Sequence, residues 1–190
     1  MAEQKKKKGK GRRAYLDDFQ ATVSGEYIYT GRTYVLPGGP ELRRRRLLQL
    51  GGVSAVMAAA AVAGGCVTGP GTGSCAYVLL PYTGSLLSAL TVLYGTLRLA
   101  KGGSPLRQYV YDATVKQFPL RTMLAAVFSA LTIAGECLYA ALHGIGGLAG
   151  GMAGFLLCQC AVLAGALLFR RLAGGMTWVP RQQDGDALLD

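Results

Sequence analysis

The side chains best suited to chemistry form a polar stripe with helical spacing in the second half of the chain. The stripe consists of Ser129, Thr132, Glu136, Tyr139 and His143, at spacings of three, four, three and four residues. Such spacings place side chains on one face of an α-helix. A carboxyl group in an otherwise apolar helix is suited to carrying a proton or binding a cation. The stripe is therefore a candidate ligand or ion pathway.

Two interpretations of Glu136 remain open. It lies about 9 Å from the end of its helix by the rise per residue, so it can be a structural carboxyl group that hydrogen-bonds Tyr139, Gln159 or a serine of the second helix. Alternatively, it titrates or binds a cation in a translocation path or polar pocket. Gln159 is the other strongly polar group in an apolar segment, and it joins the candidate pathway. His143 falls at a helix end, where an interfacial role is favoured over metal binding.

Enzyme chemistry is not indicated by the sequence. The chain has one histidine and lacks the phosphate-loop, His-Glu-x-x-His, Gly-x-Ser-x-Gly and Cys-x-x-Cys motifs. Most acid-base and nucleophilic mechanisms therefore lack partner groups. We expect a protein that is not an enzyme and that has no cofactor.

The five cysteines divide by position. Cys66 and Cys75 flank one turn between apolar segments, where an oxidising compartment would permit a disulfide. Cys137, Cys158 and Cys160 fall inside apolar segments, where cysteine behaves as a small apolar residue. Since residues two apart point to different faces of a helix, the last two do not form a chelating pair, and no metal site is expected.

The elements that must position these residues are membrane helices. The chain of 190 residues is 51% hydrophobic and only 16% charged, whereas soluble domains have about 25% charged residues. The hydrocarbon core needs about 20 apolar residues per helix, and two long windows without Lys or Arg are each broken by a glycine-rich turn. The sequence predicts an all-α integral membrane protein with a four-helix transmembrane domain of two helical hairpins (47–169), whose helices are at about 47–68, 76–98, 121–142 and 147–169.

Positive charge predicts the orientation. The net charge of +10 would suggest nucleic acid in a soluble protein, but here twelve Lys and Arg precede residue 47, five lie between Arg98 and Arg121, and three follow from Arg170. The two hairpin turns have none, and Lys and Arg favour the cytoplasmic side. We expect the chain to lie in a plasma membrane, by default that of a bacterium. Both termini, including the tail 170–190, are expected in the cytoplasm. No nucleic-acid partner is expected.

The segment before the first membrane helix has two expected parts. Residues 1–13 have the composition of a disordered basic tail, which sets topology and attracts anionic lipid headgroups. Residues 14–46 form a cytoplasmic arm, in which 25–36 predict a short β-hairpin around a Thr-Gly turn. Because an isolated hairpin is marginal in water, we expect the arm to dock onto loops of the same chain or onto another subunit. Its docking residues are Tyr15, Phe19, Tyr27, Tyr29 and Tyr34.

Small residues recur along two of the expected helices at alternating spacings of three and four. Such residues allow helix backbones to approach closely in lipid, either within one chain or between subunits. The expected packing positions are Gly84, Ser88, Gly147, Gly151, Gly154 and Gly165.

Two classes of function follow from these patterns. Closely packing helices, minimal outer turns and a tyrosine-rich arm indicate a non-catalytic subunit or accessory of a larger, transport-type membrane assembly, held by a membrane-protein partner or by self-association. The alternative is a small homo-oligomeric transporter or channel that uses the polar stripe around Glu136. The first class is the interpretation we favour, because short glycine-rich helices leave little internal volume.

Overall fold

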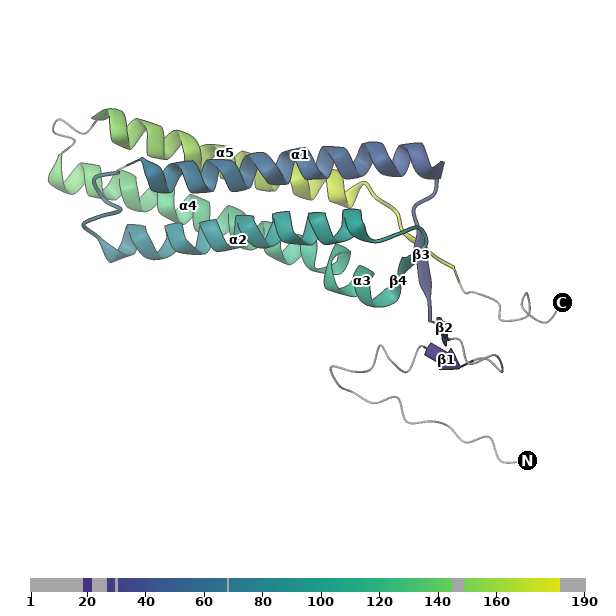
Figure 1. Cartoon of the computed structure of the whole chain (residues 1–190). Helices are drawn as coiled ribbons and strands as arrows, with labels where there is room; N and C mark the ends of the chain where they lie inside the picture. The colour runs from purple at the N-terminus through teal and green to yellow at the C-terminus, as the bar shows by residue number, and fades with distance from the viewer. Residues whose placement is uncertain (1–18, 22–26, 30, 68, 145–148, 182–190) are drawn as a thin grey trace.

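Four long helices form an elongated bundle with strands at one end (Figure 1). In the computed structural model, the residues described are 19–21, 27–29, 31–67, 69–144 and 149–181. Within these ranges, four helices are long and apolar enough to cross a membrane. This is the architecture of a multi-pass, all-helical membrane domain, as the sequence predicts.

The four helices make two consecutive hairpins and are longer than the hydrocarbon core requires. A helix of 26 residues is about 39 Å long, against a core of about 30 Å. Each helix extends past its expected apolar window at the end where Lys and Arg lie, because a charged sequence can continue a helix beyond the hydrocarbon. The helices are α1 (Gly39–Cys66), α2 (Ala76–Lys101), α4 (Phe118–His143) and α5 (Ala149–Gly174).

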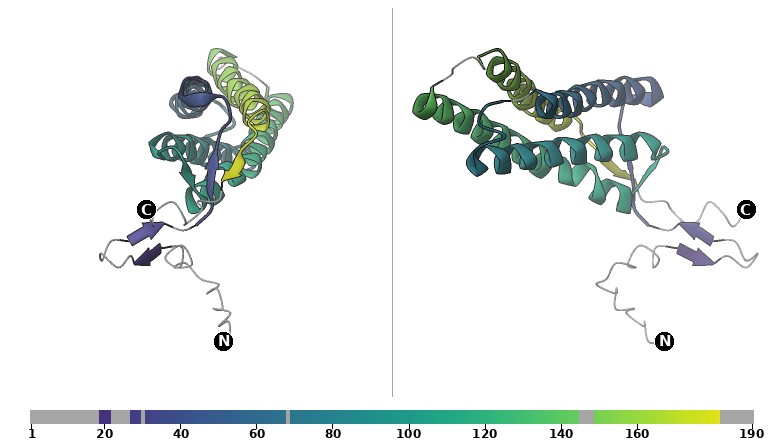
Figure 2. Two further views of the ribbon diagram at one scale, coloured as in Figure 1. Left: turned by 90° about the vertical axis from the view of Figure 1, so that its right-hand side faces the viewer. Right: turned by 60° about the vertical axis from the view of Figure 1, so that its left-hand side comes forward.

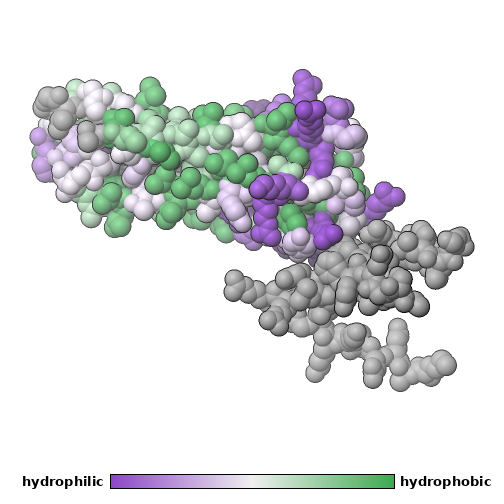
Figure 3. All heavy atoms as spheres, viewed as in Figure 1, coloured by the Kyte–Doolittle hydropathy of each residue, from purple (hydrophilic) through white to green (hydrophobic). Residues whose placement is uncertain are grey.

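The helices pack in the ring order α1, α2, α4, α5, and α5 contacts α1 again (Figure 2). Aromatic rings fill the core near the basic end, where Phe118 and Phe169 meet edge to face with ring centroids 5.1 Å apart. Large apolar side chains also cover the outside of the bundle, and Leu80 and Leu157 are 70% and 72% exposed. Figure 3 shows this apolar surface over the middle of the bundle, next to the hydrophilic end on the right. An apolar exterior of this kind matches a hydrocarbon solvent.

A small sheet joins three separate segments at the end of the bundle that carries the Lys and Arg residues, here called the basic end. Strand β3 (Thr33–Val35) lies between β4 (Leu106–Arg107) and β5 (Val179–Arg181), and both pairings are antiparallel. The short helices α3 (Gln108–Ala113) and η2 (Val115–Gln117) follow β4. The sheet therefore brings the segment before α1, the loop between α2 and α4, and the segment after α5 to one end of the molecule.

Aromatic packing reinforces this sheet. The ring of Tyr34 stacks on Tyr111 with centroids 4.0 Å apart and planes 7° apart. The ring of Trp178 meets Tyr111 edge to face at 6.1 Å. The hydroxyl of Thr33 donates to the carbonyl oxygen of Arg181 at 2.9 Å. Such contacts give a three-residue strand the side-chain packing that an isolated hairpin lacks.

The strands of the arm pair differently from the predicted hairpin. Strand β2 (Tyr27–Tyr29) pairs with β1 (Phe19–Ala21) rather than with β3. The reason is that β3 has partners on both edges, β4 and β5, which satisfy more backbone groups than one hairpin partner would. These partners are distant in sequence, so the local pattern of residues 25–36 does not reveal them.

Candidate functional site

The predicted polar stripe is divided between the interior and the surface of the bundle. Ser129, Thr132, Glu136 and Gln159 are completely buried, with exposed fractions of 0%. The first three follow one face of α4, and Gln159 comes from α5. Their burial in an apolar bundle requires hydrogen-bond partners inside the protein.

Glu136 contacts the turn between α1 and α2, which folds back into the bundle. The backbone N–H of Gly71 donates to Oε1 of Glu136 at 3.2 Å. A Cβ atom on Gly71 would overlap Oε2 of Glu136, and one on Gly69 would lie 3.2 Å from Oε1. The turn is itself held by the hydroxyl of Thr72, which donates to the carbonyl oxygen of Gly69 at 2.7 Å. Only residues without a side chain let the backbone come this close to the carboxyl group.

The expected partners of Glu136 were therefore wrong. The sequence suggested Tyr139, Gln159 or a serine of the second helix, whereas the hydrogen bond comes from a backbone N–H 65 residues away. The second carboxyl oxygen, Oε2, is buried without a hydrogen-bond partner among the described residues. A buried carboxyl group with one free oxygen can hold a proton or a small cation. Gly69 and Gly71 cover it, so the group is enclosed.

A second polar cluster connects three helices near the middle of the bundle. The hydroxyl of Ser85 in α2 donates to Oε1 of Gln159 in α5 at 3.2 Å. Since that hydroxyl has one proton, Ser129 of α4 donates to Ser85 at 2.9 Å. Interhelical hydrogen bonds of this kind contribute about 0.6 kcal/mol each in membranes. The Nε2 atom of Gln159 is buried without a partner in the described part of the chain.

The outer part of the stripe does not join these clusters. His143 is exposed and Tyr139 is half-buried, and their rings stack on each other with centroids 4.6 Å apart. The Nδ1 atom of His143 lies 3.3 Å from the carbonyl oxygen of Tyr139. This pair thus lies at the end of α4, away from the hydrogen bond between Gly71 and the buried Glu136.

Three of the six predicted packing residues face other segments of the same chain. A Cβ atom on Gly84 of α2 would lie 2.8 Å from the ring of Phe128 in α4, and one on Gly154 would lie 3.3 Å from Val67. Gly165 of α5 faces Met57 of α1 in the same way. Ser88 is buried and Gly151 half-buried, while Gly147 lies outside the described residues.

Of the predicted docking residues, Tyr34 packs onto the loop between α2 and α4 through Tyr111. Phe19, Tyr27 and Tyr29 lie in β1 and β2, and Tyr15 lies outside the described residues. Within those residues no cluster of three metal-ligating side chains occurs.

The two cysteines for which the sequence permits a disulfide across the first turn are both free in this structure. Cys66 is exposed and Cys75 is half-buried. Cys137 and Cys160 are exposed on the outside of the bundle, and Cys158 is half-buried, as expected of small apolar residues in helices that face lipid.

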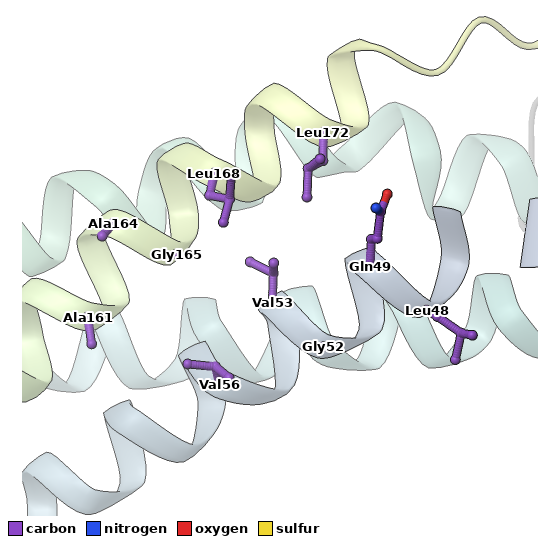
Figure 4. A pocket seen from close by; sticks show the side chains of 10 residues that line it. All are labelled: Leu48, Gln49, Gly52, Val53, Val56, Ala161, Ala164, Gly165, Leu168 and Leu172. Carbon is purple, nitrogen blue, oxygen red and sulfur yellow. The ribbon is translucent and has the colours of Figure 1, made fainter. Parts of the chain in front are cut away.

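Two grooves flank α1 in the half of the bundle nearest the basic end. The first, called the α1–α5 groove, has a volume of about 550 Å³. Figure 4 shows Val53 of α1 and Leu168 and Leu172 of α5 pointing into it, while Gly52 and Gly165 contribute no side chain. Its lining residues are Leu48, Gln49, Gly52, Val53, Val56, Ala161, Ala164, Gly165, Leu168 and Leu172.

The second, called the α1–α2 groove, lies between those two helices and has a volume of about 520 Å³. It differs from the first because Arg43 and Arg44 line it. Sequence reasoning missed both grooves. A usable signal was the pair Gly51 and Gly52, which directly follows the arginine run in α1; no atom lies within 4 Å of a Cβ built on either glycine.

Comparison of the chain with protein-family models, with curated proteins and with solved structures gave no match.

Proposed function

We propose that this chain is a non-catalytic subunit or accessory of a larger membrane assembly, and that the α1–α5 groove receives a transmembrane helix of the partner protein. The observation that carries the proposal is the open groove itself, about 550 Å³ in volume, between two helices of the bundle. Its walls contain Gly52, Ala161, Ala164 and Gly165. Residues this small allow the backbone of another helix to approach closely in lipid.

The chemistry of the groove favours a protein helix over a lipid headgroup. No charged residue lines it, and Gln49 is its only residue with a polar side chain. An apolar helix that inserts there would bury side chains against Val53, Leu168 and Leu172, and Gln49 would offer one interhelical hydrogen bond. Partner binding thus depends on shape rather than on charge.

The interior supports a non-transporting role for a single chain. Ser85, Ser129, Glu136 and Gln159 have no exposed surface, so these polar groups do not line an open path through the described bundle. Their hydrogen bonds join the helices to one another and to the turn after α1.

We also propose that the basic end faces the cytoplasm. All Lys and Arg side chains of the described residues belong to α1's first turns, the sheet and the residue before β3, the loop between α2 and α4, or the flanking ends of α2, α4 and α5. Such a bias is typical of cytoplasmic flanks, and it supports a plasma-membrane location with both termini inside.

The partner proposal predicts that Ala164→Leu releases the partner. Ala164 is exposed on the groove wall, so leucine fills the groove without disturbing the core. Overfilling a packed contact costs about 1–3 kcal/mol, which weakens binding roughly tenfold or more. The measurement is the intact mass of the complex after the full-length chain is purified from native membranes in mild detergent.

Ala130→Leu is the matched control, because Ala130 is exposed on α4 and outside the groove. A stoichiometric second protein that is present with wild type and Ala130→Leu, and lost with Ala164→Leu, supports the proposal. A wild-type preparation that contains only copies of this chain, or only this chain with lipid, contradicts it.

A second candidate function is supported by one observation, the partnerless Oε2 atom of buried Glu136. In this alternative, copies of the chain form a small transporter or channel, and Glu136 carries a proton. It predicts that wild-type protein in liposomes dissipates an imposed pH gradient faster than empty liposomes, and that Glu136→Gln removes this flux because an amide does not titrate. A pH-sensitive dye inside the liposomes gives the rate, and equal rates for wild type and variant exclude Glu136 from any such mechanism.

A further inference from the structure

We infer that the α1–α2 groove is a binding site for one anionic phospholipid, whose headgroup lies at the arginines of α1 and one of whose acyl chains lies between the two helices. The groove is distinct from the proposed partner site, because α2 rather than α5 forms its second wall, although Leu48 and Gly52 of α1 line both grooves. Its lining residues are Pro40, Arg43, Arg44, Leu47, Leu48, Gly51, Gly52, Thr96, Leu97, Ala100 and Ser104.

The groove has a polar end and an apolar end in the order that a phospholipid requires. Arg43, Arg44 and Ser104 lie at the basic end, and the lining deeper along α1 is apolar as far as Gly52. From Pro40 to Gly52 the helix rises about 18 Å. One leaflet with its headgroup region is about 20–22 Å thick, half of the full bilayer. The groove therefore spans about one leaflet.

Two of the arginines are free to bind an anion. Neither Arg44 nor Arg45 makes an ion pair or hydrogen bond with any residue that the structure describes. Both line a second depression at the same level, which shares Arg44 and Leu48 with the groove. Glu41 also lines this depression. The charges of Arg44, Arg45 and Glu41 give the depression a net charge of +1, and Arg43 of the neighbouring groove adds a further positive charge. Guanidinium groups bind phosphate through paired N–H donors.

Arg43 is held in place by the loop after α2. One of its terminal nitrogens donates to the carbonyl oxygens of Gly102 and Gly103, the latter at 2.9 Å. A guanidinium group has five N–H donors, so Arg43 keeps others for a ligand. This bond also fixes the headgroup end of the groove, because it joins the start of α1 to the end of α2.

The apolar part of the groove is open because glycine leaves it open. No atom lies within 4 Å of a Cβ built on Gly51 or Gly52. The hydroxyl of Thr96 donates to the carbonyl oxygen of Val92 at 2.9 Å, so it does not need a hydrogen-bond partner from a ligand in the groove. An acyl chain fits this lining, whereas a free phosphate ion would use only the charged end.

The experiment is lipid titration of the purified full-length chain in neutral detergent, followed by native mass spectrometry. Phosphatidylglycerol is compared with phosphatidylcholine of the same acyl chains. The expected result is one bound phosphatidylglycerol, with at least about tenfold weaker binding of phosphatidylcholine. Added inorganic phosphate should not displace the lipid.

Two variants test the two ends of the site separately. Removing two headgroup charges with R44Q/R45Q should weaken phosphatidylglycerol binding roughly 30-fold, the fold-change that corresponds to about 1 kcal/mol per basic residue. Gly51→Leu keeps every charge and fills only the acyl end, and it should reduce binding by at least about tenfold. Far-UV circular dichroism verifies that both variants remain folded.

Matched controls remove the same charge or add the same side chain elsewhere. R170Q/R171Q removes two exposed arginines from α5 at the same end of the bundle, and Gly150→Leu adds leucine to a glycine with equally open surroundings. Both controls should bind as wild type does. Equal losses for the two arginine pairs, full binding by Gly51→Leu, or equal binding of phosphatidylcholine would each overturn the inference.

Discussion

Gly84→Ala is expected to destabilise the bundle, although replacement of glycine by alanine inside a helix normally stabilises it. In α2 the added Cβ atom would lie 2.8–2.9 Å from three ring carbons of Phe128 in α4. Overpacking costs about 1–3 kcal/mol and the helix-propensity gain is about 0.8–1 kcal/mol, so we expect a net loss of up to about 2 kcal/mol. Unfolding of the purified chain by denaturant in a fixed detergent measures this free energy.

The control for this prediction is the same substitution at an open position. Gly51→Ala in α1 adds a Cβ atom with no neighbour within 4 Å, so it should stabilise the chain by up to about 1 kcal/mol. Phe128→Leu removes the ring. In the double variant Gly84→Ala/Phe128→Leu, most of the stability loss caused by Gly84→Ala should therefore disappear, which a double-mutant cycle measures as coupling between the two sites. If Gly84→Ala proves as stabilising as Gly51→Ala, the close approach of α2 and α4 is not present in the folded protein.

The transmembrane helices are the part of the fold that the sequence predicts well. Hydrophobic length and the absence of Lys and Arg identify all four spans, and the structure confirms four helices of sufficient length and apolarity. The helix ends are predicted less well, because charged residues such as Arg43 and Lys101 continue the helix beyond the apolar window. Hydropathy indicates whether a segment lies in lipid or in water. It does not indicate where the backbone hydrogen bonds of the helix end.

Contacts between distant segments are the part that the sequence does not reveal. The β propensity of Thr33–Val35 marks a strand, but its partners lie at residues 106–107 and 179–181. Likewise, the spacing of the polar stripe places Glu136 on one face of α4, but gives no indication that Gly71 reaches it. Helical periodicity identifies which side chains share a face, whereas loop backbones that fold inward have no periodic signature.

The grooves beside α1 show a related limit. A glycine in a membrane helix serves either a close contact or an open surface, and the sequence pattern is the same in both cases. Gly84 and Gly165 face side chains of neighbouring helices, whereas Gly51 and Gly52 face open space. The distinction depends on the ring order of the helices, which only the structure supplies.

The second large effect is expected at the contact between Glu136 and the turn after α1. In Gly71→Ala, the added Cβ atom would overlap Oε2 of Glu136 and lie 3.2 Å from Val78. Either the turn moves outward and the hydrogen bond to the buried carboxyl group is lost, or the side chain of Glu136 shifts in a packed interior. We expect a loss of about 1–3 kcal/mol in the free energy of unfolding, measured as for Gly84→Ala.

Gly73→Ala is the control in the same turn, because a Cβ atom there meets nothing within 4 Å. Neither Gly71 nor Gly73 has a positive φ angle, so backbone strain does not distinguish the two substitutions. Gly73→Ala should therefore leave stability nearly unchanged. In a Glu136→Ala background the overlap disappears, and Gly71→Ala should cost about 0.5–3 kcal/mol less than it does in wild type. An equal cost in both backgrounds would show that Gly71→Ala destabilises the turn alone. The close contact between Gly71 and the carboxyl group of Glu136 would then make no contribution to the cost.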